Sequence, residues 1–339
     1  MTTIWSILLA ILIFGCIIAI HEFGHFIAAK RNGIQVNEFA IGMGPKIFRF
    51  QKGETLYSLR LFPVGGFCSM EGEDAESKNA RAFDQKPVWR RMIVVLAGAF
   101  MNLVLGFVLL IATTCSDPYL ISNHKQATSN TCGLQAGDTI VSLNGSHIFT
   151  ITDLQYKLSN ESGEPFTVVV ERDGKKVKLQ DVTFRDQENN DWLDFSLEPQ
   201  QKTVFHVLSY AAKDTVATGK LIWMSLTELV TGKYGIQDLS GPVGTVEVIS
   251  NAATAGATAA ERISSVLHLT IFITINVGIF NLLPIPGLDG SRFWFLFLEA
   301  IRRKPVKKEH EALVHLVGMA ALFLLMIVVT VQDVTRIFH

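Results

Sequence analysis

The chain has 339 residues, of which 49% are hydrophobic and only 18% are charged, and its net charge is −1. That composition is too apolar for an ordinary soluble protein of this length. The balanced charge indicates no nucleic-acid partner, and the sequence contains neither a dinucleotide-binding fingerprint nor a P-loop. The four cysteines do not have a metal-ligand spacing. Cys115 and Cys132 would share one compartment, and the sequence leaves a bond between them open.

Four apolar stretches without acidic or basic residues predict membrane-spanning helices. A bilayer core requires about 20 apolar residues in a helix. The stretches that approach or pass this length are residues 4–20, 92–116, 263–288 and 312–332. Residues 204–230 are also apolar but contain Lys213, Asp214, Lys220 and Glu228, which favours an amphipathic helix at the membrane surface. We therefore predict a multi-pass α-helical membrane protein with about four transmembrane helices, with three or five as the alternatives.

Basic residues assign the connecting segments to the two sides of the membrane, because cytosolic loops are rich in Lys and Arg. Residues 30–91 contain eleven Lys and Arg, and the short connection 292–308 contains six. The segment after Ser116 has only Lys125 near the membrane. This distribution predicts that 30–91 and 292–311 are cytosolic, and that both termini and residues 117–203 are extracytosolic.

Two segments outside the spans have strand character. Residues 35–70 are rich in glycine, with candidate strands at 36–40, 46–50, 55–61 and 66–70. This segment is apolar for a cytosolic loop, so we expect a membrane-associated β element whose backbone is satisfied by protein or water. Residues 128–199 predict a small α+β module with a tight Asn144-Gly145 turn, a helix near 153–160 and a hairpin at Asp173-Gly174. A peptide-binding unit and a plain structural domain are both compatible with this module.

The strongest chemical signal is the run His21-Glu22-Phe23-Gly24-His25. In a helix His21 and His25 lie on one face, one turn apart, where two imidazoles can bind one Zn²⁺. Glu22 can take a proton from the water that such a metal activates. An ionisable residue inside an apolar span costs at least about 2.5 kcal/mol. Three within five positions therefore favour metal binding over a chance pentapeptide.

A catalytic zinc site takes three protein ligands and leaves one position open. Asp289 is the best third ligand, because two prolines and two glycines in residues 281–290, around Asp289, break the end of an apolar span. On the predicted orientation Asp289 and the histidine pair lie at similar depth. An ordinary turn acid is the alternative for Asp289. Glu299 and Glu309 are rival ligands, although a basic loop offers both a solvated role.

Three asparagines lie in apolar segments. Asn281 and Asn276 precede Asp289 by one turn or more, and a buried amide there is suited either to stabilising an oxyanion or to an interhelical hydrogen bond. Asn102 follows the small residues Ala97-Gly98-Ala99, which suit close helix packing, and we interpret it as structural. His268 and His315 stand alone on apolar faces and are interpreted in the same way.

Together these motifs resemble the site-2 protease family of intramembrane zinc metalloproteases, and within it the RseP-type bacterial members. Weaker matches are residues 42–45, 63–67 and 239–244, so the resemblance spans nearly the whole chain. It implies that His21, His25 and Asp289 bind Zn²⁺, that Glu22 is the base, and that Asn281 places the substrate or stabilises the intermediate. It also implies that the 35–70 strands engage substrate as an added strand and that 128–199 is one extracytosolic PDZ-like domain. The chain has Gly98-Ala99 where family members often have Gly-Pro, and room for only one such domain where some relatives have two.

The function expected from the sequence is hydrolysis of peptide bonds in or near the transmembrane segments of single-span proteins, such as anti-sigma factors or remnant signal peptides. The alternative is a zinc-dependent membrane protein without proteolytic activity, a transporter or a scaffold presenting the PDZ-like domain. The lipid bilayer is the other partner, and the expected location is the bacterial cytoplasmic (inner) membrane. The predicted segments are the first transmembrane helix 1–29, the cytosolic-side loop 30–91, the second helix 92–116, the PDZ-like domain 117–203, an interfacial region 204–262, the third helix 263–291, the basic loop 292–311 and the fourth helix 312–332.

Overall fold

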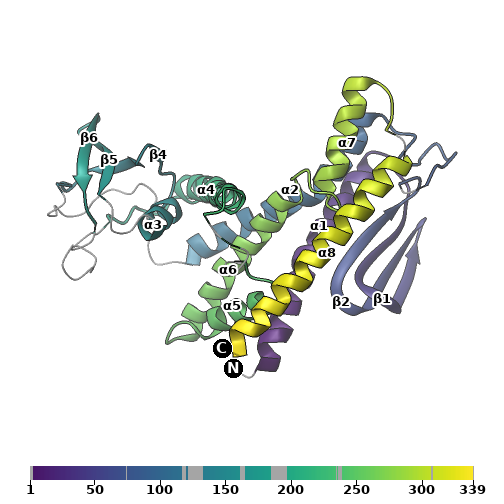
Figure 1. The fold of residues 1–339 in the computed structure, drawn as a ribbon, viewed down its shortest axis with the longest axis horizontal. Helices are drawn as coiled ribbons and strands as arrows, with labels where there is room; N and C mark the ends of the chain where they lie inside the picture. The colour runs from purple at the N-terminus through teal and green to yellow at the C-terminus, as the bar shows by residue number, and fades with distance from the viewer. Residues whose placement is uncertain are drawn as a thin grey trace. The chain divides into compact units, whose positions relative to one another are not determined.

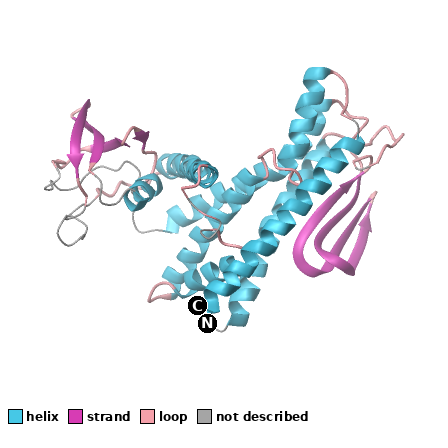
Figure 2. Ribbon diagram, viewed as in Figure 1, coloured by secondary structure: helices cyan, strands magenta, loops and turns pink. Residues whose placement is uncertain are grey.

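The computed structural model describes residues 3–73, 75–116, 120, 133–160, 165–184, 197–233, 235, 239–306 and 308–338. The chain divides into two compact units, Met1–Gly106 with Glu228–His339, and Phe107–Thr227. We describe each unit by itself. Figures 1 and 2 show the first as a group of helices with one β hairpin, and the second as a small sheet with helices.

Within the residues that the structure describes, four helices are long and apolar enough to cross a membrane, as the sequence predicts. They are α1 (Thr3–Arg31), α2 (Val88–Ser116), α6 (Ala259–Phe280) and α8 (Lys308–Phe338). The first of them ends where Gly33 adopts a left-handed conformation with φ +67°, a backbone state that glycine reaches without steric cost. Most of the large hydrophobic side chains of α8 are exposed, and a lipid environment would cover them.

The β element is a hairpin of two long antiparallel strands, β1 (Val36–Lys52) and β2 (Thr55–Met70). The four short strands that we predicted are joined in pairs, because the turn glycines bend the strands without ending them. Gly42, Gly44 and Gly65 all have φ near +85°. The hairpin consequently curls, and Phe39 pairs with both Tyr57 and Cys68.

Glu38 holds the curled hairpin from inside. Its carboxylate accepts hydrogen bonds from Ser58 at 2.6 Å, Arg60 at 2.8 Å and Lys46 at 3.0 Å. Burial raises the pKa of Glu38, but these three donors outweigh it and lower the pKa to about 2. The carboxylate is therefore ionised at neutral pH and ties the two halves of β1 to β2.

Small residues let the helices of the first unit approach closely. A side chain on Gly24 of α1 would collide with Met101 of α2, 2.7 Å away, and a side chain on Gly106 would meet Ile275 of α6. Such close contact is typical of helix packing in membranes. A first apolar cluster then joins α1, the hairpin and α2, and a second joins α1, α5 (Pro242–Thr254) and α6.

Close contact with Asp333 gives the reason why residues 241 and 244 are glycines. Asp333 is a buried residue of α8, and its carboxylate accepts hydrogen bonds from the amides of Gly241 (3.2 Å) and Gly244 (2.8 Å) at the start of α5. A side chain at either glycine would collide with this carboxylate. Asp333 thus caps a helix that has no side-chain cap of its own.

The second unit contains a four-stranded antiparallel sheet in the order β4-β3-β5-β6. The strands are β3 (Thr139–Leu143), β4 (Ser146–His147), β5 (Phe166–Arg172) and β6 (Lys175–Val182), and α3 (Ile151–Asn160) follows β4. The predicted Asn144-Gly145 and Asp173-Gly174 turns are confirmed, because all four residues have positive φ as a two-residue hairpin turn requires. Cys132 and much of 117–132 lie outside the described residues, so the pairing with Cys115 stays open.

The long helix α4 (Val204–Val230) has the bounds of the predicted amphipathic segment. One side contacts the α+β module: Thr152 donates to Asp214 at 2.7 Å, and Lys220 donates to the His147 carbonyl at 2.6 Å. At its start, Lys202 donates to the carbonyl of Cys115, at the end of α2. Exposed apolar side chains gather on another face of α4, because successive residues of a helix are rotated by about 100°. They are Val204, Phe205, Leu208, Val216, Trp223 and Val230.

We expect the α+β module to lose stability in acid through Asp138. Its side chain is fully buried and accepts two hydrogen bonds from Arg172, both at 2.7 Å, and one from the amide of Gln135. Burial raises the pKa of Asp138, but these donors outweigh it and hold the pKa below its usual value. The stabilisation is therefore complete above the unfolded pKa of about 3.9 and is lost as the pH falls through the lower folded pKa.

Hydrogen exchange in the intact protein measures this effect. The protection factors of the β3 and β5 amides should fall between pH 6 and pH 3. Asp138→Asn should lower them at pH 6 and reduce the further fall on acidification. If the protection factors of the wild type and of Asp138→Asn fall equally on acidification, Asp138 is not the source of the acid sensitivity.

Candidate metal centre

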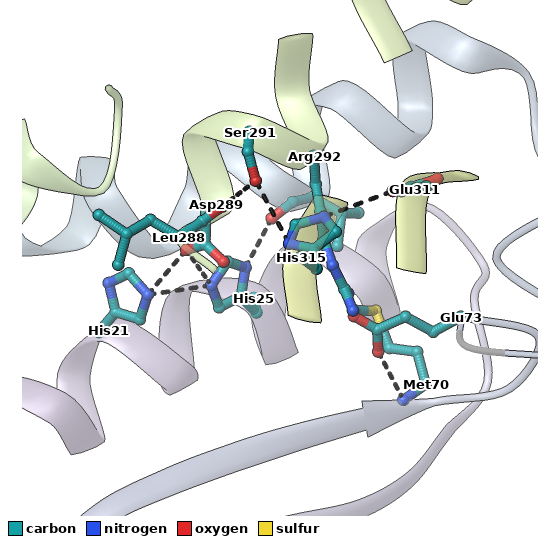
Figure 3. A network of polar contacts seen from close by, with 11 residues as sticks. His21, His25, Met70, Glu73, Leu288, Asp289, Ser291, Arg292, Glu311 and His315 are labelled. Carbon is teal, nitrogen blue, oxygen red and sulfur yellow. Dashed lines mark hydrogen bonds and ion pairs between the residues drawn. The ribbon is translucent and has the colours of Figure 1, made fainter. Parts of the chain in front are cut away.

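Three potential metal ligands from distant parts of the chain meet in the first unit. Nε2 of His21 lies 2.9 Å from Oδ2 of Asp289, Nε2 of His25 lies 3.1 Å from the same oxygen, and the two nitrogens are 3.2 Å apart. Figure 3 shows the three side chains pointing toward one another, the histidines from α1 and Asp289 from α7 (Asp289–Arg302). Both histidines are buried. These are the three residues that the sequence brings forward as ligands.

The separations fit a single small cation. Zinc binds imidazole nitrogen and carboxylate oxygen at about 2.0–2.2 Å, so two ligand atoms of a tetrahedral site lie about 3.4 Å apart. The three distances found here are shorter by only a few tenths of an ångström. One nitrogen from each imidazole and one carboxylate oxygen leave a fourth position for water or substrate, which is the donor set of a catalytic zinc site.

Hydrogen bonding orients the second histidine. Nδ1 of His25 lies 2.8 Å from the carbonyl oxygen of Val94 on α2. A carbonyl can only accept, so Nδ1 carries the proton and Nε2 presents its lone pair to the cluster.

Gly98 of α2 provides the space beside the two imidazoles. A Cβ at this position would lie 2.7 Å from Cε1 and 2.8 Å from Nε2 of His21, and closer still to Nε2 of His25. Any side chain would therefore occupy the place where a metal and its ligands must fit. From the sequence, Gly98 was interpreted as one of three small residues that suit close helix packing and as half of a departure from a family pattern.

A break between α6 and α7 places Asp289 beside the two histidines. The third span, predicted as 263–291, ends earlier, because α6 stops at Phe280 and Asp289 begins the separate helix α7. Gly287 has φ +94° in the turn before it. A side chain on Gly290 would collide with the backbone of Leu282, 2.6 Å away. The α7 helix also occupies most of the segment that we predicted as a basic loop.

Contacts from other elements hold this turn in place. His315 of α8 accepts a hydrogen bond from the amide of Gly287 at 3.1 Å, and Ser291 donates to the carbonyl of Leu288 at 2.8 Å. Arg292 forms an ion pair with Glu73, in the segment that follows β2. Figure 3 shows this network on the far side of Asp289 from His21. His315, predicted to be a satisfied histidine away from the metal, is thus a support of the ligand turn.

Glu22 faces the hairpin. Its carboxylate interacts with the backbone N–H of Cys68 on β2. A Cβ on Gly66 would lie 3.4 Å from its Cγ. The glutamate between the two histidines therefore lies next to residues 66–68 of β2.

The structure separates the remaining candidates. Glu299 forms a two-armed ion pair with Arg91, at 2.6 and 3.1 Å, and Glu309 is exposed in the first turn of α8; neither belongs to the cluster. Asn281 is the C-cap of α6. Within the described residues no hydrogen bond joins its side chain to the cluster, so its role stays a prediction.

Asn102, which we interpreted as structural rather than catalytic, lies next to one of the candidate ligands. It is fully buried, and its side-chain nitrogen lies 3.3 Å from Nδ1 of His21. The sequence contained one indication of this contact, because Gly98 and Asn102 are four residues apart and therefore lie on the same face of the second span.

Two histidines and an aspartate whose ligand atoms lie within 4.8 Å of one another, with a glutamate between the histidines, form the arrangement expected of a metal-dependent hydrolase. The family profile described as Peptidase family M50 matches residues 9–325. A relative from Clostridium acetobutylicum is 37% identical, and the match covers 97% of each chain. "Regulator of sigma-W protease RasP" of Bacillus subtilis is 32% identical, and "Zinc metalloprotease RasP" of Bacillus licheniformis is 33% identical, each over 98% of this chain and 99% of the relative.

The chain therefore belongs to Peptidase family M50, the site-2 protease family, and is a zinc-dependent endopeptidase of the membrane. This assignment excludes the alternatives of a transporter and a non-proteolytic scaffold.

Proposed function

We propose that the enzyme hydrolyses peptide bonds within or next to the transmembrane segments of single-span proteins, including anti-sigma factors or remnant signal peptides. The observation that carries this proposal is the cluster of buried His21 and His25 with half-buried Asp289, in a chain that contains four candidate membrane-spanning helices among its described residues. Hydrolysis needs water, and hydrocarbon contains almost none. A site made of polar groups inside such a bundle is suited to a substrate that never leaves the bilayer.

In the proposed mechanism His21, His25 and Asp289 hold zinc, which supplies Lewis-acid polarisation and a water acidic enough to react near pH 7. The Glu22 carboxylate takes a proton as the water oxygen attacks the scissile carbonyl carbon. When the carbon–nitrogen bond breaks, Glu22 returns this proton to the leaving amine. The Asn281 amide holds the substrate backbone or stabilises the oxyanion.

The hairpin is the proposed binding edge for the substrate. A transmembrane helix hides its peptide bonds in its own hydrogen bonds, so it must unwind before it can be cut. An unwound segment paired with β2 regains backbone hydrogen bonds and runs past Glu22. Exposed apolar residues of the hairpin, among them Ile47, Phe48, Leu61 and Phe62, support its contact with lipid.

The proposed location is the bacterial cytoplasmic membrane, with both termini and the PDZ-like domain outside. The basic residues of 30–91 and 292–308 support this orientation. The exposed apolar face of α4, which begins at the end of α2, supports contact of that helix with the membrane surface.

The PDZ-like domain is the proposed filter that admits substrates already shortened outside the membrane. Deleting 128–199 should therefore allow cleavage of full-length substrates that the intact enzyme rejects, while shortened ones are cut as before. Unchanged selectivity would count against a filter and favour a structural domain.

Metal removal and product mapping test the proposed function as a whole. The purified enzyme in lipid discs should cut a single-span reporter inside or at the edge of its span. Chelation should abolish cleavage and added Zn²⁺ should restore it, because the three ligands supply no nucleophile of their own. Mass spectrometry of the products locates the cut. Cleavage only in the soluble parts of the reporter, or cleavage that survives complete zinc removal, would refute the proposal.

A further inference from the structure

One face of α2 lies against both histidines. Val94, Gly98 and Asn102 are spaced by four residues and therefore follow one another along a single face of the helix. The Val94 carbonyl faces His25, Gly98 leaves space beside both imidazoles, and Asn102 faces His21. Since α1 supplies the histidines one turn apart, each imidazole meets its own polar group on α2.

The two histidines need the same protonation pattern. For each of them Nε2 points into the cluster with Asp289, so a metal there requires Nε2 without a proton and Nδ1 with one. The Nδ1 proton of His25 goes to the Val94 carbonyl. The Nδ1 proton of His21 needs an acceptor as well, because a buried donor without a partner is costly.

Asn102 offers that acceptor. In the structure its amide nitrogen is the atom 3.3 Å from Nδ1 of His21, while its buried Oδ1 has no partner among the described residues. The oxygen and nitrogen of an amide exchange places by a half-turn with little change in shape. After that half-turn the orphaned oxygen faces the imidazole proton.

We infer that Asn102 is a positioning residue that accepts the hydrogen bond of the His21 Nδ1–H and thereby directs the Nε2 lone pair to the metal. It touches neither metal nor substrate. Acceptors that hold a ligand histidine in this way typically contribute a factor of about 10 to 100 in metal affinity. The inference rests on the proposed ligand role of His21.

Zinc affinity, measured by competition with a chelator on the detergent-solubilised full chain, tests the inference. Asn102→Leu keeps the size but removes the acceptor, and should weaken zinc binding about 10- to 100-fold. Asn102→Asp keeps the acceptor, and should bind zinc within a few-fold of the wild type. The visible spectrum of the Co²⁺-loaded protein should change for Asn102→Leu and stay close to the wild type for Asn102→Asp.

Thr113→Val is the matched control on the same helix, because Thr113 is buried and, among the described residues, donates only to carbonyls of its own helix. Its zinc affinity should equal that of the wild type. If Asn102→Leu fails to fold, Asn102→Ala serves as the variant without an acceptor. Unchanged zinc affinity without the acceptor, or an equal loss in Asn102→Asp, would overturn the inference. Full zinc binding by His21→Ala would instead refute the proposed ligand set.

Discussion

Glu22→Gln should lower the cleavage rate of a single-span reporter by about 10²- to 10⁴-fold, the usual contribution of a general base. Glutamine has nearly the shape of glutamate, but its amide cannot take a proton from water at neutral pH. The change leaves His21, His25 and Asp289 in place, so zinc content should remain that of the wild type. Reporter cleavage and metal analysis on the same preparation measure the two effects together.

Glu309→Gln is the matched control for this loss. It makes the same chemical change at an exposed position of α8, which the sequence had offered as a rival ligand. Its activity and its zinc content should both be unchanged. If Glu22→Gln cleaves the reporter at the wild-type rate, the mechanism proposed for Glu22 is wrong.

Gly98→Ala should remove zinc and activity together. The added methyl group would lie within 3 Å of both imidazoles, so either the rings rotate away or α1 and α2 move apart. Rotation of His25 would also break its hydrogen bond to Val94. We expect metal content close to background and no detectable cleavage, measured by elemental analysis and by the reporter.

Ala112→Val adds two methyl groups at an exposed position of α2, and tests whether this helix tolerates added volume in general. It should retain zinc and activity. A Gly98→Ala protein that binds zinc with full affinity would show that the space beside the imidazoles is larger than the structure indicates.

The two predictions separate the parts of the site. Glu22→Gln should leave an inactive enzyme that still binds zinc and substrate. Gly98→Ala should instead leave an enzyme without zinc. Native membranes containing the Glu22→Gln protein should therefore accumulate uncut substrates, and trapping them there would identify the substrate class.

Local features of the chain could be predicted because their causes lie within a few residues. Helical periodicity alone places His21 and His25 on one face, and the two prolines and Gly287 before Asp289 suffice to break the helix. The turns at Asn144-Gly145 and Asp173-Gly174 follow from residues that accept positive φ. The four candidate spans among the described residues follow from the length of the apolar stretches.

The rest depended on contacts between residues far apart in sequence. The sequence by itself determined the histidine pair and the glutamate between them, and predicted Asp289 as the third ligand. Only the tertiary structure decided that Asp289 begins a new helix, that Glu299 pairs with Arg91, and that Gly98 and Asn102 face the histidines. A glycine or an asparagine in an apolar helix has the same local signature whether it faces lipid, a neighbouring helix or a metal site. Its role is set by which helix packs against it, and that follows from the fold as a whole.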